Sequence, residues 1–134
     1  IVEKEPVFRV LNDNYYIDLS GSIMPLSENY SERIPLILSE VDSTELMSLG
    51  MLGNYFKNDI FFSNHITGLE IIDNEFLFHV NNFKYLIKMK DLSDFKSRFN
   101  NYKVFYKTVI NDSVLVKLKS INLNFKNQVI VQKR

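Results

Sequence analysis

The chain has 134 residues, of which 46% are hydrophobic and 24% are charged, as in an ordinary single globular domain. Sixteen acidic and sixteen basic side chains cancel, so bulk charge does not predict binding to nucleic acid or to an anionic membrane. Cysteine is absent, which excludes disulfides and thiolate metal sites. No apolar run approaches the ~20 residues of a membrane-spanning helix. Because the chain begins with Ile1 and not Met, we expect a piece of a longer protein, with any membrane anchor upstream.

The N-terminal third predicts short strands separated by turns. Pro6 interrupts the first strand, and a strand tolerates proline only at an edge or an end. Ser20-Gly21 marks a turn between the next two strands. Pro35 predicts a peripheral position for the fourth strand. The predicted strands are residues 2–11, 15–19, 23–24 and 33–38.

The first predicted helix begins at Asp42. Its carboxylate can cap the first turn, and Glu45 three residues later gives the spacing of a capping box. Gly50 and Gly53 weaken the helix but permit close packing against a sheet. Apolar residues recur at steps of three and four, which predicts one buried stripe. The stripe comprises Leu46, Leu49, Leu52, Phe56 and Ile60.

Strands return after this helix. Asp73-Asn74 and Asn81-Asn82 separate three apolar runs, which is the pattern of an antiparallel meander. A second helix follows over residues 91–109, with aromatic residues on one face. The meander comprises residues 69–72, 76–80 and 85–89. The helix face comprises Phe95, Phe99, Tyr102, Phe105 or Tyr106, and Val109.

The C-terminal stretch alternates apolar and polar residues in two groups. The phase of the alternation slips near Ser120, which suggests a bulge or bend. A last apolar run at 129–131 closes the chain. The groups are Val114, Val116 and Leu118, then Ile121, Leu123 and Phe125. The order of elements predicts an α+β domain, a largely antiparallel β-sheet with two main helices packed on it.

Residues with catalytic or metal-binding chemistry are sparse. His65 with Asp59 and Glu70 lacks the spacing of a zinc site. His79 alternates with apolar strand residues, so we expect it to face solvent. The four glycines form no phosphate-binding loop, and no nucleophile motif is present. We therefore expect no catalytic, cofactor-binding or metal-binding residues, and no cofactor.

Three segments form a recognisable set. Residues 2–9 with 16–27 are similar to a junction at which the last strand of a POTRA domain leads into the next domain. Residues 24–33 have the pattern MPLS-x-N-Y-x-x-R, which is typical of one Gram-negative branch of the family that these segments resemble. The helix that ends at Phe105-Tyr106 follows, and residues 121–129 are similar to the C-terminal pattern INL-x-Y-K-N-Q-V. In this order, over nearly the whole chain, the segments resemble the FtsQ/DivIB family of bacterial cell-division proteins.

The resemblance implies a membrane-anchored scaffold without catalytic activity. Members of the FtsQ/DivIB family have a single inner-membrane helix, followed by a POTRA domain and a β-domain of the FtsQ type in the periplasm. Residues 1–11 would be the terminal POTRA strand, and residues 12–134 the β-domain. The implied partners are the division proteins FtsB and FtsL, with no nucleic acid and no small-molecule substrate. The role implied is in the divisome during septum formation.

The implied partner-binding site is the C-terminal strand, which would bind a partner segment as one more strand. Phe125 falls at the position of the family's aromatic anchor, where relatives commonly have Tyr. Asn124, Asn127 and Val129 would frame the contact. From its spacing alone, Phe125 could instead point into the core in phase with the apolar residues before it.

Two other functions are compatible with the sequence. A POTRA-associated scaffold of a secretion or outer-membrane assembly system would have further POTRA repeats upstream and a barrel downstream. An enzyme of unrecognised type would have a deep polar pocket with several carboxylates or His65.

Overall fold

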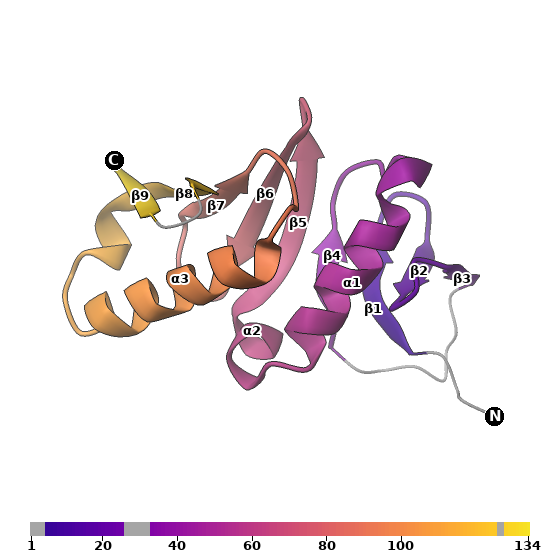
Figure 1. Cartoon of the computed structure of the whole chain (residues 1–134), viewed down its shortest axis with the longest axis horizontal. Helices are drawn as coiled ribbons and strands as arrows, with labels where there is room; N and C mark the ends of the chain where they lie inside the picture. The colour runs from indigo at the N-terminus through magenta and orange to yellow at the C-terminus, as the bar shows by residue number, and fades with distance from the viewer. Residues whose placement is uncertain (1–4, 26–32, 126–127) are drawn as a thin grey trace.

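A nine-stranded sheet is the frame of the computed structural model, which describes residues 5–25, 33–125 and 128–134. The strand order is β3-β2-β1-β4-β5-β6-β7-β8-β9 (Figure 1). Neighbours are antiparallel except for the pairs β1–β4, β4–β5 and β7–β8. The strands are β1 (Pro6–Val10), β2 (Tyr15–Asp18), β3 (Ile23–Pro25), β4 (Leu36–Ile37), β5 (Ile66–Ile72), β6 (Glu75–Val80), β7 (Leu86–Met89), β8 (Leu118–Phe125) and β9 (Gln128–Lys133).

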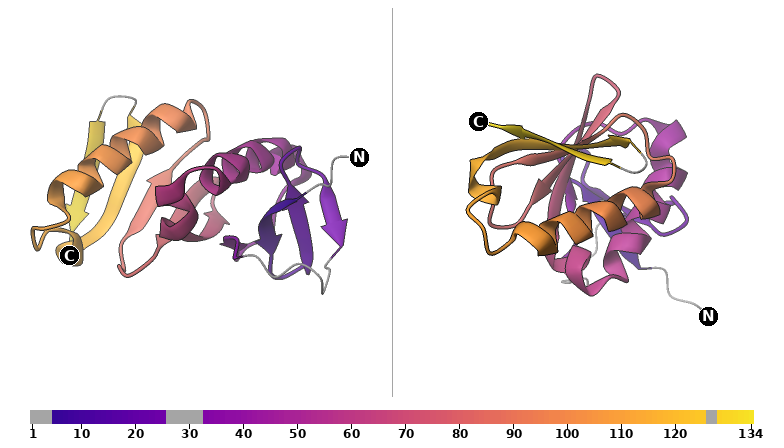
Figure 2. Two further views of the ribbon diagram at one scale, coloured as in Figure 1. Left: turned by 90° about the horizontal axis from the view of Figure 1, so that it is seen from below. Right: turned by 60° about the vertical axis from the view of Figure 1, so that its left-hand side comes forward.

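Helices cover one face of this sheet. The described helices are α1 (Leu46–Lys57), α2 (Ile60–His65) and α3 (Phe95–Val109), with 3-10 turns η1 (Ser43–Glu45) and η2 (Leu115–Lys117). Helix α1 packs on β1 and β2, whereas α3 packs on β8 and β9 (Figures 1 and 2). The expected α+β class, a largely antiparallel sheet with two main helices packed on it, is confirmed.

The β2–β3 turn shows why glycines stand in α1. The buried Asp18 carboxylate accepts hydrogen bonds from the backbone N–H groups of Ser20 (3.0 Å) and Ser22 (2.9 Å), and this fixes the turn. A Cβ atom on Gly50 would lie 2.6 Å from the Gly21 nitrogen and 2.7 Å from the Asp18 carbonyl. The helix therefore lies directly against the turn, and the prediction of close packing at the glycines is confirmed.

The fourth strand is central, so the peripheral position predicted from Pro35 is wrong. Strand β4 lies between β1 and β5 and is parallel to both. Pro35 directly precedes the strand, and its carbonyl accepts a hydrogen bond from the Arg9 N–H at 3.1 Å. Its missing N–H is therefore not needed by the sheet. On the other side, the Leu38 N–H donates to the Leu69 carbonyl at 2.8 Å, which joins the two halves of the sheet.

Strand β1 is an interior strand of the same sheet, between β2 and β4. Val7, Phe8 and Val10 are at most 1% exposed. The first predicted strand is thus present over Pro6–Val10, with Pro6 at its start. The assignment of residues 1–11 to a POTRA domain and of 12–134 to the β-domain stays a prediction.

The start of the first helix confirms the predicted capping box. The Thr44 N–H donates to Asp42 Oδ1 at 3.0 Å, and the Asp42 N–H donates to Glu45 Oε1 at 3.2 Å. The first turn is the 3-10 segment η1, and α1 continues from it. Leu49, Leu52 and Phe56 of the predicted stripe are fully buried.

The last residue of the predicted stripe does not belong to it. Ile60 is 88% exposed, because α1 ends at Lys57 and a separate helix, α2, begins at Ile60. Asp59 causes the break by capping α2, since its Oδ1 accepts from the N–H groups of Phe61 (2.9 Å) and Phe62 (3.1 Å). The continuous stripe predicted through Ile60 is wrong for this reason.

The C-terminal half follows the predicted order with two corrections. The helix predicted over 91–109 begins at Phe95, because Asp94 before it has a left-handed backbone (φ 52°). Strands β5, β6 and β7 form the predicted antiparallel meander. The alternation at 114–118 is not a strand, because residues 115–117 form η2 and Val116 is 63% exposed. Strand β8 begins at Leu118, and its pairing with β9 shifts between Leu118 and Ser120, as the phase slip predicts.

Four phenylalanines join the helices to the sheet. Phe56 from α1, Phe62 from α2, Phe78 from β6 and Phe99 from α3 are all at most 1% exposed. The Phe99 ring lies edge-on to Phe56 (5.0 Å between centroids) and to Phe78 (5.2 Å). Phe62 lies 5.5 Å from both Phe56 and Phe99. Edge-on pairs at these distances stabilise the core beyond the burial of their area.

A polar chain runs through the same core. His65 Nε2 and the Tyr102 hydroxyl are joined by a hydrogen bond of 2.5 Å, and a second one of 2.5 Å joins the hydroxyls of Tyr102 and Tyr85. Burial lowers the pKa of His65 from 6.5 to about 4, because the charged imidazolium would lose its hydration. Burial also raises the pKa values of both tyrosines. These three side chains are therefore neutral and hydrogen-bonded to one another at pH 7.

We expect Phe99→Ala to reduce the free energy of unfolding by about 3–5 kcal/mol, because it opens a cavity between α1, β6 and α3. Urea denaturation followed by circular dichroism measures this loss. Val104→Ala, on the exposed side of the same helix, is the control and should change stability by less than about 0.5 kcal/mol. Equal effects of the two substitutions would show that the cluster does not hold the fold.

The free energy of unfolding should decrease as the pH is lowered from about 6.5 to about 4, because His65 titrates in this window. The folded state has the lower pKa, so the unfolded state binds the proton more readily. The stabilisation is complete above pH 6.5 and is lost as pH falls toward 4, up to ~3 kcal/mol. Urea denaturation at several pH values measures it. His65→Gln, which cannot titrate, should flatten the profile; an unchanged slope would contradict this origin.

Candidate functional site

The sheet has two edges of very different extent. Strand β3, at one edge, has three residues, whereas β9, at the other, has six. Among the described residues, β9 pairs with β8 on one side and with no strand on the other. Such an edge has a row of backbone N–H and C=O groups that another strand can pair with. The structure therefore has one long free edge, at β9.

Apolar side chains lie along this edge on both faces of the sheet. Phe125, at the end of β8, is 53% exposed, and Ile130 and Val131 of β9 are also exposed. Val129 is partly buried against the core. Phe125 pairs with Gln128, after a register shift beyond Asn122. An exposed aromatic ring beside an unpaired apolar strand is typical of a protein interface.

Helix α3 lies beside the free edge. The helix packs on both β8 and β9, and Phe105 and Val109 are partly buried against the core. Val104, on the same helix, is 58% exposed. A strand added to β9 would therefore have α3 near one of its faces and solvent at the other.

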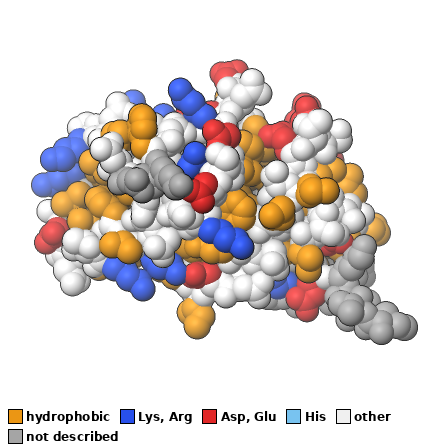
Figure 3. All heavy atoms as spheres, in the orientation of Figure 1, with side chains coloured by type: hydrophobic (Ala, Val, Ile, Leu, Met, Phe, Trp, Pro, Cys, Tyr) orange, Lys and Arg blue, Asp and Glu red, His pale blue; other side chains and the backbone are white. Residues whose placement is uncertain are grey.

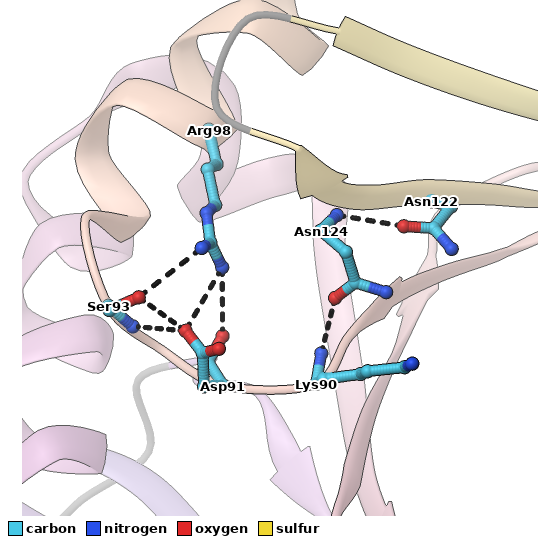
Figure 4. A network of polar contacts seen from close by, with 6 residues as sticks. All are labelled: Lys90, Asp91, Ser93, Arg98, Asn122 and Asn124. Atoms are coloured by element: carbon cyan, nitrogen blue, oxygen red, sulfur yellow. Dashed lines mark hydrogen bonds and ion pairs between the residues drawn. The ribbon is translucent and has the colours of Figure 1, made fainter.

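A polar network fixes the residues around the start of this edge (Figure 4). The Lys90 N–H donates to Asn124 Oδ1 at 2.6 Å, and the Asn124 N–H donates to Asn122 Oδ1 at 2.8 Å. The Asn124 side chain thus ties β8 to the residue that follows β7. Its amide oxygen is engaged inside the domain, so Asn124 positions the strand that ends in Phe125.

A second set of hydrogen bonds, next to the first along the chain, ties the loop after β7 to Arg98 of α3 (Figure 4). The guanidinium donates to the Asp91 carbonyl and carboxylate at 3.2 Å each, and to the Ser93 hydroxyl at 3.2 Å. Hydrogen bonds from Ser93 and the charge of Arg98 hold the pKa of Asp91 below its usual value. Arg98 itself is 9% exposed. The loop between β7 and α3 is therefore fixed, and with it the place of α3 beside the edge.

The sequence-predicted site residues have different environments. Phe125 is half exposed, while Ile121 and Leu123 are buried, so Phe125 does not share their place in the core. Val129 is partly buried, and Asn124 is hydrogen-bonded to Lys90. Asn127 lies outside the described residues. That these residues bind a partner stays a prediction.

Sequence reasoning missed the exposed pair Ile130 and Val131. The signal was present, because residues 129–131 are three apolar residues in succession, and in a strand such a run places apolar side chains on both faces. A single-residue anchor at Phe125 therefore understates the apolar surface at this edge.

Neither histidine gathers several carboxylates around it in the part of the chain that the structure describes. Within residues 5–25, 33–125 and 128–134, no group of three His, Cys, Asp or Glu side chains could hold a metal ion. His79 Nε2 lies 2.7 Å from Glu70 Oε1, while His65 is buried beneath α3. In the same residues, no helix has both the length and the apolarity needed to cross a bilayer.

The comparison with family models gives a match over residues 5–132, to the family described as FtsQ/DivIB, C-terminal related. A comparison with curated proteins gave no match. The family match indicates a scaffold role in bacterial cell division, with protein–protein contacts in the divisome. FtsQ/DivIB proteins are membrane-anchored, with their division domains in the periplasm. With 128 consecutive residues matched, the chain belongs to the FtsQ/DivIB C-terminal related family.

Proposed function

We propose that this domain is a non-catalytic scaffold of the divisome that binds FtsB-like and FtsL-like division proteins by β-strand addition at β9 during septum formation. The observation that carries the proposal is the free edge of β9, six residues long. A partner strand would satisfy its unpaired backbone groups and extend the sheet. The family match supports the same role.

Phe125 would anchor the partner, and Ile130 with Val131 would widen the apolar contact. Buried aromatic anchors often contribute most of the binding energy of an interface. Phe125 is half exposed in the domain alone, so a partner can still bury much of its ring. Val129, partly buried against the core, would lie beneath the partner. Asn124 would hold β8 in place by accepting the hydrogen bond from the Lys90 N–H. Asn127, two residues after Phe125, would complete the contact.

A scaffold fits the surface better than an enzyme does. The hollow of about 430 Å³ between α1 and α3 is lined mainly by apolar and amide side chains. Its carboxylate, Asp59, is paired with Lys103 at 2.5 Å and caps α2. No described hollow combines several carboxylates with a histidine. The family match to division proteins also weighs against a secretion or outer-membrane assembly scaffold.

In the full protein, the domain would lie in the periplasm, carried by a single inner-membrane helix and a POTRA domain upstream. The family's membrane anchorage supports this placement. The domain would then meet the periplasmic segments of its partners.

The proposal predicts that Phe125→Ala weakens binding to the periplasmic FtsB segment from the same genome by more than about 1 kcal/mol, or fivefold in Kd. The loss arises because the anchor no longer buries its ring, while the fold keeps its core. Isothermal titration of the domain with FtsB alone and with FtsB plus FtsL measures it.

Ile23→Ala is the matched control, since Ile23 is 58% exposed on the opposite edge strand β3. This variant should bind as the unmodified chain does. Unchanged affinity of a folded Phe125→Ala variant, or an equal loss in the Ile23 variant, would contradict docking at β9.

A further inference from the structure

Charge is strongly segregated along the chain, although its net value is zero. Thirteen of the sixteen acidic residues lie in residues 1–80, and twelve of the sixteen basic residues lie in 81–134. The two parts therefore have formal charges of −9 and +9. The second part begins after β6 and contains β7, α3, β8 and β9, so the basic part is the one that includes the free edge.

Five exposed cations gather around the end of β9. Lys133 pairs with Leu118 in the β8–β9 ladder, and the Arg134 N–H donates to the Lys117 carbonyl at 3.0 Å. Lys84 and Arg134 line one hollow of about 270 Å³ together with Val116. In Figure 3 most of the basic side chains visible on that face lie over the half that contains α3 and the C-terminal strands. The cations are Lys84, Lys117, Lys119, Lys133 and Arg134.

These cations have no partner of opposite charge among the described residues. Within the part of the chain that the structure describes, none of the five takes part in an ion pair. In the basic part, Arg98 pairs with Asp91 and Lys103 pairs with Asp59, and both basic residues lie on α3. Charge at the end of β9 is thus available to a ligand.

The free edge has two chemically different ends. Phe125 pairs with Gln128 at the start of β9, and this end is aromatic. Lys133 at the other end is five residues further along, or about 16 Å in an extended strand. A strand that pairs along the whole edge would contact both ends at once.

We infer that the edge takes an acidic segment, with carboxylates about five residues from its apolar anchor. This inference rests on the proposed strand addition at β9. A second copy of the chain is a poor occupant, because pairing of two β9 strands would bring together two parts of formal charge +9. The position of the carboxylates in the partner sequence also shows in which direction the partner strand runs along β9. The carboxylates precede the anchor if the partner strand is antiparallel to β9 and follow it if the strand is parallel.

The test uses the periplasmic FtsB segment as the probe and the double variant Lys117→Gln/Lys133→Gln. Titration at about 0.05 M and about 0.5 M salt separates charge from apolar contact. We expect the variant to bind about five- to tenfold more weakly at low salt and to lose most of the salt dependence. The matched control, Lys96→Gln/Lys107→Gln, removes two exposed cations of α3 and should stay within about twofold.

A second measurement places the carboxylates on the partner. Each acidic residue of the segment is replaced by its amide, and the affinity for both chains is determined. Amide replacements about five positions from the anchor should weaken binding to the unmodified chain. The same replacements should have no further effect on binding to the double variant.

Two results overturn the acidic segment while strand addition stands. One is equal affinity of the double variant and the unmodified chain, with binding still lost in Phe125→Ala. The other is a weak salt dependence with no effect of the amide replacements. A probe that does not bind, or that binds Phe125→Ala equally well, overturns the proposed function and this inference together. A dimer in sedimentation that Ile130→Lys disrupts would identify a second copy as the occupant and also overturn it.

Discussion

The contact between Phe56, Phe62, Phe78 and Phe99 is the constraint on which the rest of the domain depends. Strand β4, only two residues long, connects the two halves of the sheet through its backbone pairing with β1 and β5. The four rings add a side-chain connection, because they come from α1, α2, β6 and α3. They fix α3 over the C-terminal strands, and Arg98 fixes the loop from which α3 begins. The free edge is therefore part of a rigid frame, which lowers the entropy cost of binding a partner.

The two ends of the sheet differ in a way that fits one docking site. Edge strand β3 has only three residues, and a short edge offers little to another chain. Edge strand β9 is twice as long, is apolar at its start and is surrounded by cations at its end. Backbone pairing would give affinity, the aromatic end would give register, and the charges would speed association and reject a second copy. Scaffold function then needs no reactive group, only an edge left unpaired.

Local sequence signals predicted most elements and part of the site. The capping box at Asp42, the meander and the slip near Ser120 depend on near neighbours, so they were correct. The break at Asp59 was missed because Ile60 continues the helical spacing while the cap ends it. The central place of β4 was missed because strand order depends on distant partners. At the site, Phe125 was placed by resemblance, but its exposure, the bond from Lys90 to Asn124 and the cation cluster needed three dimensions.

Amide hydrogen exchange, measured by NMR with and without the periplasmic FtsB segment, tests the central claim most directly. Backbone N–H groups at the free edge exchange readily in the domain alone and slow down when a strand pairs with them. The account predicts new protection in β9, between Gln128 and Lys133, and none at Ile23 and Met24 of β3. Binding that protects β3, or that leaves the exchange of β9 unchanged, would contradict docking by strand addition at this edge.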